Sequence, residues 1–231
     1  MVENGSTPGQ GGTAVLCSAG LDSAVLLADE ATRGAVTPVY VGVGLAWEAD
    51  ERAALVRLLE APPLAGRTRP AQMVTFDMRD VYPASHWAIR GVPPAYDTPD
   101  EDVYLVGRNL VLLTKAAVLC AQLGLSRIVL GPLAGNPFPD ASPEFFAAIA
   151  RAASLGLATP IAVDAPYRAL EKSDVIRRGV ALGVPLALTL SCMSPRQGMH
   201  CGACSKCRER HDAFLEAGVA DPTPYLVPSP R

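Results

Sequence analysis

The sequence predicts an α/β protein with a doubly wound, mainly parallel sheet, and three observations support this prediction. Short apolar runs, typical of strands buried on both faces, alternate with segments whose apolar residues recur at helical spacing. Before residue 78 the order is strand, helix, strand, helix, strand, which indicates parallel strands joined by crossover helices. A turn of small residues separates the first strand from the first helix, where such folds bind ligands.

The expected elements follow from the same patterns. The expected strands are residues 13–17, 36–43, 71–77, 127–131 and 158–164, and the expected helices are residues 21–31, 48–59, 109–122 and 170–182. Pro143 and Glu144 suit the first turn of one more helix. The proline-rich residues 78–105 are too long for a plain connection and indicate a functional loop. We expect a disordered lead-in over residues 1–12, an α/β domain over 13–190, and a C-terminal element over 191–231 that packs on it.

Composition narrows the class of protein. The chain has 231 residues, 49% of them hydrophobic, and a formal net charge of −3, which argues against binding nucleic acid or anionic membranes through bulk charge. No apolar run reaches the roughly 18 residues of a membrane span, and the N-terminus lacks the features of a signal peptide. Four of the six cysteines cluster near the C-terminus, which indicates metal binding in a reducing cytoplasm. We therefore expect a cytoplasmic protein.

The turn SAGLDS, residues 18–23, has the features of an anion site. Backbone N–H groups and the helix dipole favour negative charge there, and the hydroxyls of Ser18 and Ser23 can donate hydrogen bonds. Asp22 could hold Mg²⁺ or orient the loop. The alternative is that Asp22 is an ordinary first-turn residue and Ser18 a helix cap. The Walker and dinucleotide motifs do not fit, because no Lys follows and only Gly20 is present.

SAGLDS resembles the SGGxDS loop of the N-type ATP pyrophosphatases, which split ATP into AMP and pyrophosphate. Ala19 stands where that family has its second Gly, so we expect a negative φ at Ala19 or a phosphate slightly farther away. The residues expected to contact ATP are Leu16, Cys17, Ser18, Ala19, Gly20, Leu21, Asp22, Ser23 and Gly131.

Four further residues are candidates for the site. Arg108 lies at a helix entry, where a guanidinium can reach phosphate or carboxylate. Lys172 lies near a helix start and opposes the dipole, which indicates an external partner such as phosphate; a solvated Lys is the alternative. His86 and Trp87 could stack on a heterocycle. Alternatively, Trp87 fills a core gap and His86 lies at the surface.

Cys192, Cys201, Cys204 and Cys207 are spaced as C-x₈-C-x₂-C-x₂-C. Four thiolates suit one tetrahedral Zn²⁺, with Zn–S distances near 2.3 Å. An iron–sulfur cluster is the alternative, because C-x₂-C-x₂-C also occurs in iron–sulfur proteins. Since four thiolates complete the shell, we expect a structural zinc ion that holds the surrounding loop.

The chain resembles the 7-cyano-7-deazaguanine synthases over about residues 13–225. The resemblance rests on five motifs in this order: SAGLDS, GRNLVLLTKAA, FPDASPEFF, APYRALEKSDVI and CGACSKCRERHDAFLEAGVADPTPY. The resemblance implies ATP-dependent conversion of 7-carboxy-7-deazaguanine and ammonia into the nitrile, through an acyl adenylate, with release of AMP and pyrophosphate. By position, the SAGLDS loop would hold pyrophosphate and Mg²⁺. Asp22, Ser23, Lys172 and Arg108 would carry the chemistry, and Asp140 would pair with the base edge as an ionised acceptor.

Three departures concern the substrate half more than the ATP half. This chain has SAG where the family has SGG. It has PDAS, with Ala141 and Ser142, where the family usually has PDCR, and the segment after its second strand lacks the QRH-type stretch often found in the family. Two alternatives therefore stay open: an ATP pyrophosphatase that acts on another carboxylate or a thiolated target, and a zinc-bearing relative without catalysis. The sequence does not decide between a monomer and a homodimer.

Overall fold

The computed structural model describes residues 12–227 and contains one five-stranded sheet in the order β3-β2-β1-β4-β5. The strands are β1 (Gly12–Leu16), β2 (Val36–Gly42), β3 (Gln72–Thr75), β4 (Leu125–Val129) and β5 (Ala162–Asp164). Every neighbouring pair is parallel. The strand order reverses at β1, which creates a crevice at the carboxyl end of β1. The prediction of a parallel α/β sheet is confirmed.

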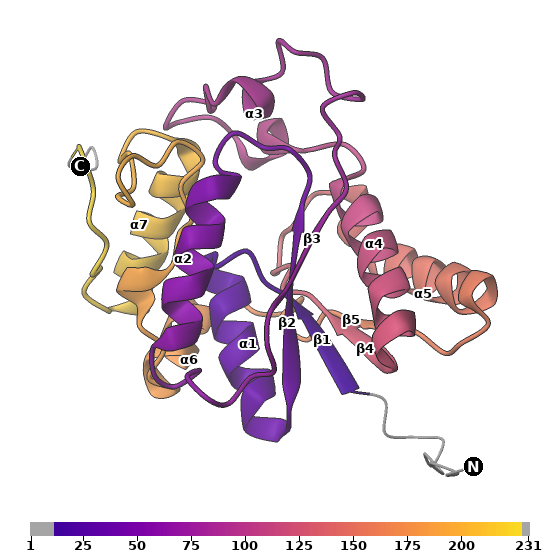
Figure 1. Ribbon diagram of the computed structural model, residues 1–231. Helices are drawn as coiled ribbons and strands as arrows, with labels where there is room; N and C mark the ends of the chain where they lie inside the picture. Colours follow the sequence, from indigo (N-terminus) through magenta and orange to yellow (C-terminus); the bar gives the residue numbers. More distant parts are fainter. Residues whose placement is uncertain (1–11, 228–231) are drawn as a thin grey trace.

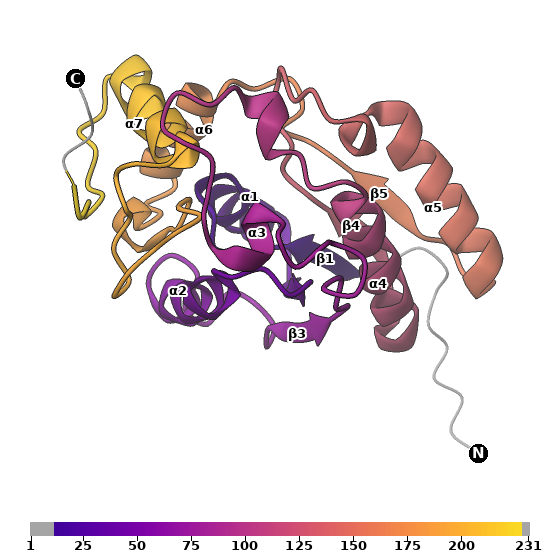
Figure 2. The same ribbon diagram turned by 90° about the horizontal axis from the view of Figure 1, so that it is seen from above.

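Helices cover both faces of the sheet (Figure 1). The helices α1 (Leu21–Arg33), α2 (Glu48–Glu60), α6 (Lys172–Ala181) and α7 (Ser205–Ala217) lie on one side, and α4 (Arg108–Leu123) and α5 (Pro143–Leu157) lie on the other. The short α3 (Trp87–Arg90) lies above the strand ends (Figure 2). Three 3₁₀ turns complete the described elements: η1 (Asp100–Val103), η2 (Pro139–Ala141) and η3 (Leu186–Leu188).

Side-chain alternation along the strands divides the core between the two faces. In β1, Val15 belongs to the cluster that includes α1, α2 and α6, whereas Ala14 and Leu16 belong to the cluster that includes α4 and α5. All three side chains are buried, and the seven residues of β2 are buried as well. Burial on both faces explains why these strands appear in the sequence as continuous apolar runs.

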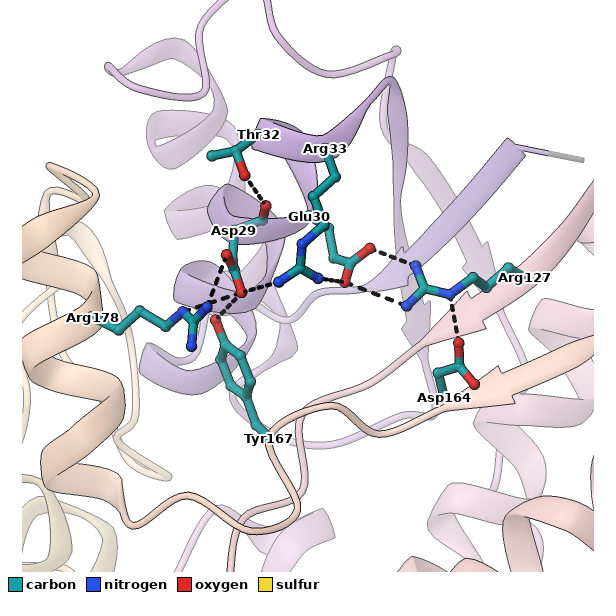
Figure 3. A network of polar contacts seen from close by, with 8 residues as sticks. All are labelled: Asp29, Glu30, Thr32, Arg33, Arg127, Asp164, Tyr167 and Arg178. Atoms are coloured by element: carbon teal, nitrogen blue, oxygen red, sulfur yellow. Dashed lines mark hydrogen bonds and ion pairs between the residues drawn. The ribbon is translucent and has the colours of Figure 1, made fainter. Parts of the chain in front are cut away.

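A network of ion pairs ties α1 to the neighbouring elements (Figure 3). The buried Glu30 carboxylate accepts hydrogen bonds from Arg33 at 2.6 Å and Arg127 of β4 at 2.5 Å, and Arg127 also donates to Asp164 of β5 at 2.5 Å. The buried Asp29 carboxylate pairs with Arg178 of α6 at 3.2 Å. The network therefore fixes the far end of the helix that begins at the SAGLDS turn.

Most element boundaries agree with the sequence predictions to within a few residues. The fifth strand is shorter than expected, because α5 extends to Leu157 and the chain must first turn at Ala158. Residues 78–105 contain α3 and η1 within an otherwise irregular segment. The expected lead-in lies outside the described residues except for Gly12, which belongs to β1. Across residues 12–227, no helix combines the length and hydropathy needed to cross a membrane.

Candidate active site

A cavity of about 420 Å³ opens at the carboxyl ends of β1, β2 and β4. The SAGLDS turn and Lys172 form one end, and a group of aromatic and acidic side chains forms the other. Among the residues expected from sequence, the lining includes Leu16, Cys17, Ser18, Gly20, Leu21, Asp22, Ser23, Trp87, Arg108, Gly131, Asp140 and Lys172. The structure therefore brings most of the predicted site residues to one cavity.

The SAGLDS turn leads directly into α1. Gly20 is the N-cap residue, and its carbonyl accepts hydrogen bonds from Ala24 N at 2.9 Å and Ser23 Oγ at 3.1 Å. Ala19 has a φ of +61°, so of the two alternatives expected for it the negative φ is wrong, and the more distant phosphate stays a prediction. The Ala19 carbonyl, held by Leu190 N at 2.8 Å, belongs to a turn whose backbone favours glycine. Ala19 is fully buried and does not line the cavity, so its methyl group does not occupy the space above the turn.

Lys172 is the first residue of α6 and pairs with two carboxylates. Its Nζ lies 3.2 Å from Asp22 Oδ2 and donates a short hydrogen bond to Glu209 of α7. Burial by itself would lower the pKa of Lys172, but Asp22 and Glu209 outweigh it and hold that pKa above its ordinary value. These carboxylates offset the unfavourable helix dipole, so the alternative of a solvated Lys is wrong.

Asp22 has one free oxygen. Oδ2 pairs with Lys172, whereas Oδ1 is buried and has no hydrogen-bond partner among the described residues. Burial raises the pKa of Asp22, and the charge of Lys172 opposes that effect. A buried carboxylate oxygen without a partner, beside a turn that presents backbone N–H groups, suits a divalent cation bound together with phosphate.

The base of α4 joins Arg108 to Asp140. The Asp140 carboxylate accepts a hydrogen bond from Asn109 N at 2.9 Å, and its backbone carbonyl accepts one from Asn109 Nδ2 at 3.0 Å. Asp140 therefore holds the first turn of α4. Burial raises the pKa of Asp140, and the hydrogen bonds from Asn109 and the charge of Arg108 oppose this effect. The Nε of Arg108 is buried without a hydrogen-bond partner in the part of the chain that the structure describes.

Glu51 of α2 is a site residue that the sequence reasoning missed. It lines the cavity, is 7% exposed, and accepts hydrogen bonds from Tyr40 Oη at 2.9 Å and Trp47 Nε1 at 3.1 Å. Burial raises the pKa of Glu51, and the charge of Arg108 opposes this. Acidic residues are common in the first turn of a helix at the protein surface, so the position of Glu51 in the sequence did not indicate a role in the site.

The aromatic residues separate into two positions. Trp87 lines the cavity and stacks on Trp47, with ring centroids 5.7 Å apart and planes 8° from parallel. His86 stacks between Tyr82 and Trp87, and its Nδ1 accepts a hydrogen bond from Ala88 N as the N-cap of α3. His86 is not among the residues that line the cavity, so it contacts Trp87 without facing the cavity itself.

The four predicted cysteines converge beside α7. Their Sγ atoms all lie within 4.8 Å of one another, with Cys204 to Cys207 at 3.5 Å and Cys201 to Cys207 at 3.8 Å. The Sγ of Cys192 accepts hydrogen bonds from two backbone N–H groups, at 3.2 and 3.3 Å. Such bonds stabilise metal-bound thiolates. The cluster therefore has the composition and compactness of a metal site.

The cysteine cluster is connected to the cavity through α7. Cys204 is the N-cap of this helix, and Lys206 and Glu209 of its first turns line the cavity. Lys206 Nζ lies 2.5 Å from Glu209 Oε2. The two lysines, Lys172 and Lys206, lower the pKa of Glu209 to about 2, against the effect of its burial. A structural metal would thereby place charged groups at the phosphate end of the cavity.

The fold and the site together define a parallel α/β protein whose cavity at the strand ends suits a nucleotide and whose C-terminal part carries a cluster of four cysteines. The family model described as "Queuosine biosynthesis protein QueC" matches residues 88–218. The 7-cyano-7-deazaguanine synthase of Methanopyrus kandleri is 36% identical over 229 residues, covering 93% of this chain and 98% of that protein. The enzymes of the same name from Magnetococcus marinus and Myxococcus xanthus are 33% and 35% identical, covering 93% and 91% of this chain and 96% of each relative.

The chain belongs to the QueC family of 7-cyano-7-deazaguanine synthases. Among solved structures, the U34-tRNA thiolase NcsA from Methanococcus maripaludis, with its 4Fe–4S cluster, is similar at 10% identity and a TM-score of 0.47, covering 90% of this chain and 67% of that one. At that level we infer neither its substrate nor its cluster for this chain.

Proposed function

We propose that the protein converts 7-carboxy-7-deazaguanine and ammonia into 7-cyano-7-deazaguanine, with cleavage of ATP to AMP and pyrophosphate. Membership of the family supports this function. The observation in the molecule that carries it is a single cavity with the SAGLDS turn and two lysines at one end and aromatic and acidic side chains at the other. ATP and a flat heterocyclic acid would meet between the two ends.

The reaction requires activation of a carboxylate. The substrate carboxylate attacks the α-phosphorus of ATP, which gives an acyl adenylate and releases pyrophosphate. Ammonia displaces AMP to give the amide. A second adenylation, on the amide oxygen, allows loss of AMP and a proton to form the nitrile. Each step needs its partners aligned and its developing negative charge neutralised, which is chiefly a task of positioning.

The residues at the phosphate end suit this task. The backbone of the SAGLDS turn, with Ser18, Gly20 and Ser23, would bind the β- and γ-phosphates at the N-terminus of α1. Mg²⁺ would be held by the free oxygen of Asp22 and by phosphate oxygens, and it would neutralise charge on the leaving pyrophosphate. Lys172, already protonated by its ion pairs, would turn from Glu209 toward phosphate.

Arg108 and Gly131 would complete the nucleotide half of the site. Arg108 lines the cavity with an unpaired Nε, and it is the cation best placed for the α-phosphate or the substrate carboxylate. Gly131 follows β4 and lines the cavity beside α1, where a Cβ would lie 3.4 Å from Leu26 and 3.8 Å from the Asp22 backbone. Two buried carboxylates, Asp140 and Glu51, face the heterocycle end.

We propose that the four cysteines bind zinc. A tetrahedral ion with Zn–S bonds near 2.3 Å separates its sulfur atoms by about 3.8 Å, and the pairs above lie at 3.5 and 3.8 Å. A cluster of four irons holds its thiolates farther apart than a single ion does. The zinc would have no open position for substrate, so its role is to hold α7 and the Cys192 loop. A cytoplasmic location and the two oligomeric states, monomer and homodimer, remain expectations.

The function is tested by product stoichiometry. Purified protein with ATP, Mg²⁺ and ammonium should release AMP and pyrophosphate only when 7-carboxy-7-deazaguanine is present. Asp22→Ala should abolish this release without lowering the melting temperature by more than a few degrees. ADP and orthophosphate as the main products would reject the assignment, as would pyrophosphate release that requires a different acid.

A further inference from the structure

We propose that Glu51, rather than Asp140, is the residue that selects a guanine-like base, by accepting hydrogen bonds from its ring N–H and 2-amino group. The proposal rests on the function above and names the residue that determines base specificity at the same site. It follows from the way the two buried carboxylates of the cavity are engaged.

The Asp140 carboxylate is engaged in holding secondary structure. Its Oδ2 accepts the Asn109 backbone N–H at 2.9 Å, and its Oδ1 lies 3.5 Å from Asn109 Nδ2. Both oxygens therefore face Asn109, in the first turn of α4, where the backbone N–H groups have no partner within the helix. Each Asp140 oxygen has one donor, as each Glu51 oxygen does, so the number of free acceptor sites does not separate the two carboxylates. They differ in their surroundings: Asp140 holds the start of the helix that also carries Arg108, whereas Glu51 is held by Tyr40 and by Trp47, which stacks on Trp87. Asp140 is accordingly a positioning residue for Arg108.

The Glu51 carboxylate is held by two hydrogen bonds and can accept more. One donor reaches each oxygen, Tyr40 Oη at 2.9 Å and Trp47 Nε1 at 3.1 Å. A carboxylate has about four acceptor sites, so about one remains on each oxygen. The edge of a guanine-like base presents a ring N–H and an amino N–H side by side, which matches two carboxylate oxygens. An adenine-like edge presents an acceptor there and would meet repulsion.

The surroundings of Glu51 suit a flat ring. Trp47, which donates to Glu51, is 6% exposed and stacks nearly parallel on Trp87, and both rings line the cavity. Arg108 also lines the cavity, and its charge lowers the pKa values of both Glu51 and Asp140. A base read by Glu51 would lie against an indole wall, and Arg108 would be available for its carboxylate.

A binding assay tests the proposal without turnover. Trp47 and Trp87 are the two tryptophans of the sequence, so intrinsic fluorescence reports occupation of this end of the cavity. The probes are 7-carboxy-7-deazaguanine and its analogue without the 2-amino group. We expect the unsubstituted protein to prefer the 2-amino base by roughly 5- to 150-fold, the value of one buried hydrogen-bonding group. In Glu51→Gln this ratio should fall to near one.

Two matched variants serve as controls. Glu48→Gln makes the same change in the same helix at a carboxylate that is 5% exposed, but Glu48 binds the Val43 and Gly44 N–H groups and does not line the cavity. Asp140→Asn keeps an oxygen that can cap α4. Both variants should retain the preference for the 2-amino base. Retention of the preference in Glu51→Gln, or its loss in Asp140→Asn alone, would overturn the proposal.

A second Glu51 variant covers the case in which Glu51→Gln does not fold. Glu51→Asp keeps the charge but withdraws the carboxylate by one methylene. It should weaken binding of the 2-amino base, which loses two hydrogen bonds, more than binding of the analogue, which loses only the bond from its ring N–H. Equal weakening of both bases would contradict the proposal. If the unsubstituted protein shows Glu51-dependent preference yet forms no nitrile, the proposed function fails and the role of Glu51 stands. If the unsubstituted protein forms the nitrile but Glu51→Gln keeps the same preference for the 2-amino base, the proposed function stands and the role of Glu51 fails.

Discussion

Replacement of Arg210 by Met should destabilise the protein and loosen the nucleotide turn. Arg210 of α7 is 0% exposed. Its guanidinium donates to Thr223 Oγ1 at 2.6 Å, Thr189 Oγ1 at 2.9 Å, Ser191 Oγ at 3.2 Å and the Leu186 carbonyl at 2.8 Å. It therefore fixes the segment from Leu186 to Ser191, and Leu190 of that segment donates to the Ala19 carbonyl at 2.8 Å.

The magnitude follows from the bonds lost and the charge removed. Four hydrogen bonds at about 1 kcal/mol each amount to roughly 4 kcal/mol, and relief from burying a cation offsets part of that loss. The net cost should be about 2–3 kcal/mol. For a chain of this length, each kcal/mol lowers the melting temperature by about 2–4 °C, so the expected drop is about 4–12 °C. The KM for ATP should rise as well, because Leu190 no longer holds the turn.

Scanning calorimetry with metal analysis provides the assay, because Arg210 lies near the cysteine cluster and the two effects must be separated. Arg177→Met is the matched control: this side chain is 48% exposed and pairs with Asp174 at 2.7 Å, and its loss should change stability by less than about 0.5 kcal/mol. If Arg210→Met, with its metal retained, melts within a degree or two of Arg177→Met, the role given to Arg210 is wrong.

Two further predictions concern the cysteines. Cys204→Ser should reduce bound metal from about one zinc per chain and lower the melting temperature before the remaining folded protein loses activity; iron with sulfide in the unsubstituted protein would contradict the zinc assignment. Cys120 is 0% exposed, and burial raises the pKa of its thiol to about 11. At pH 8 only about a thousandth of it would be thiolate. Mass spectrometry should find Cys120 alkylated by iodoacetamide only after unfolding, and rapid labelling of native protein would refute its placement.

Periodicity and motif spacing were sufficient to predict the parallel sheet, the SAGLDS turn and the convergence of the four cysteines. These features depend on local signals. The apolar runs of β1 and β2 indicate burial on both faces, and a small-residue turn before a helix follows from chain geometry. The C-x₂-C-x₂-C spacing keeps three of the four thiols close along the chain, so a local turn can bring them to one metal ion.

The remaining features depend on contacts between segments that are distant in sequence. Lys172 lies between Asp22 and Glu209 because α6 and α7 pack side by side, and no local pattern near residue 172 reveals those partners. Glu51 lines the cavity in a position held by Tyr40 of β2 and by Trp47, and the pattern of α2 alone does not reveal these partners. The positive φ of Ala19 is likewise imposed by its surroundings, since alanine itself disfavours that conformation.

The central claim is that this cavity makes a nitrile from a deazaguanine acid, and mass spectrometry of the base product tests it most directly. Purified protein with 7-carboxy-7-deazaguanine, ATP, Mg²⁺ and ¹⁵N-ammonium should yield 7-cyano-7-deazaguanine whose nitrile nitrogen is ¹⁵N. The acid loses both carboxylate oxygens, and AMP and pyrophosphate accumulate with the product. Unchanged acid in the presence of folded, metal-loaded protein, or an amide that is never dehydrated, would contradict the claim.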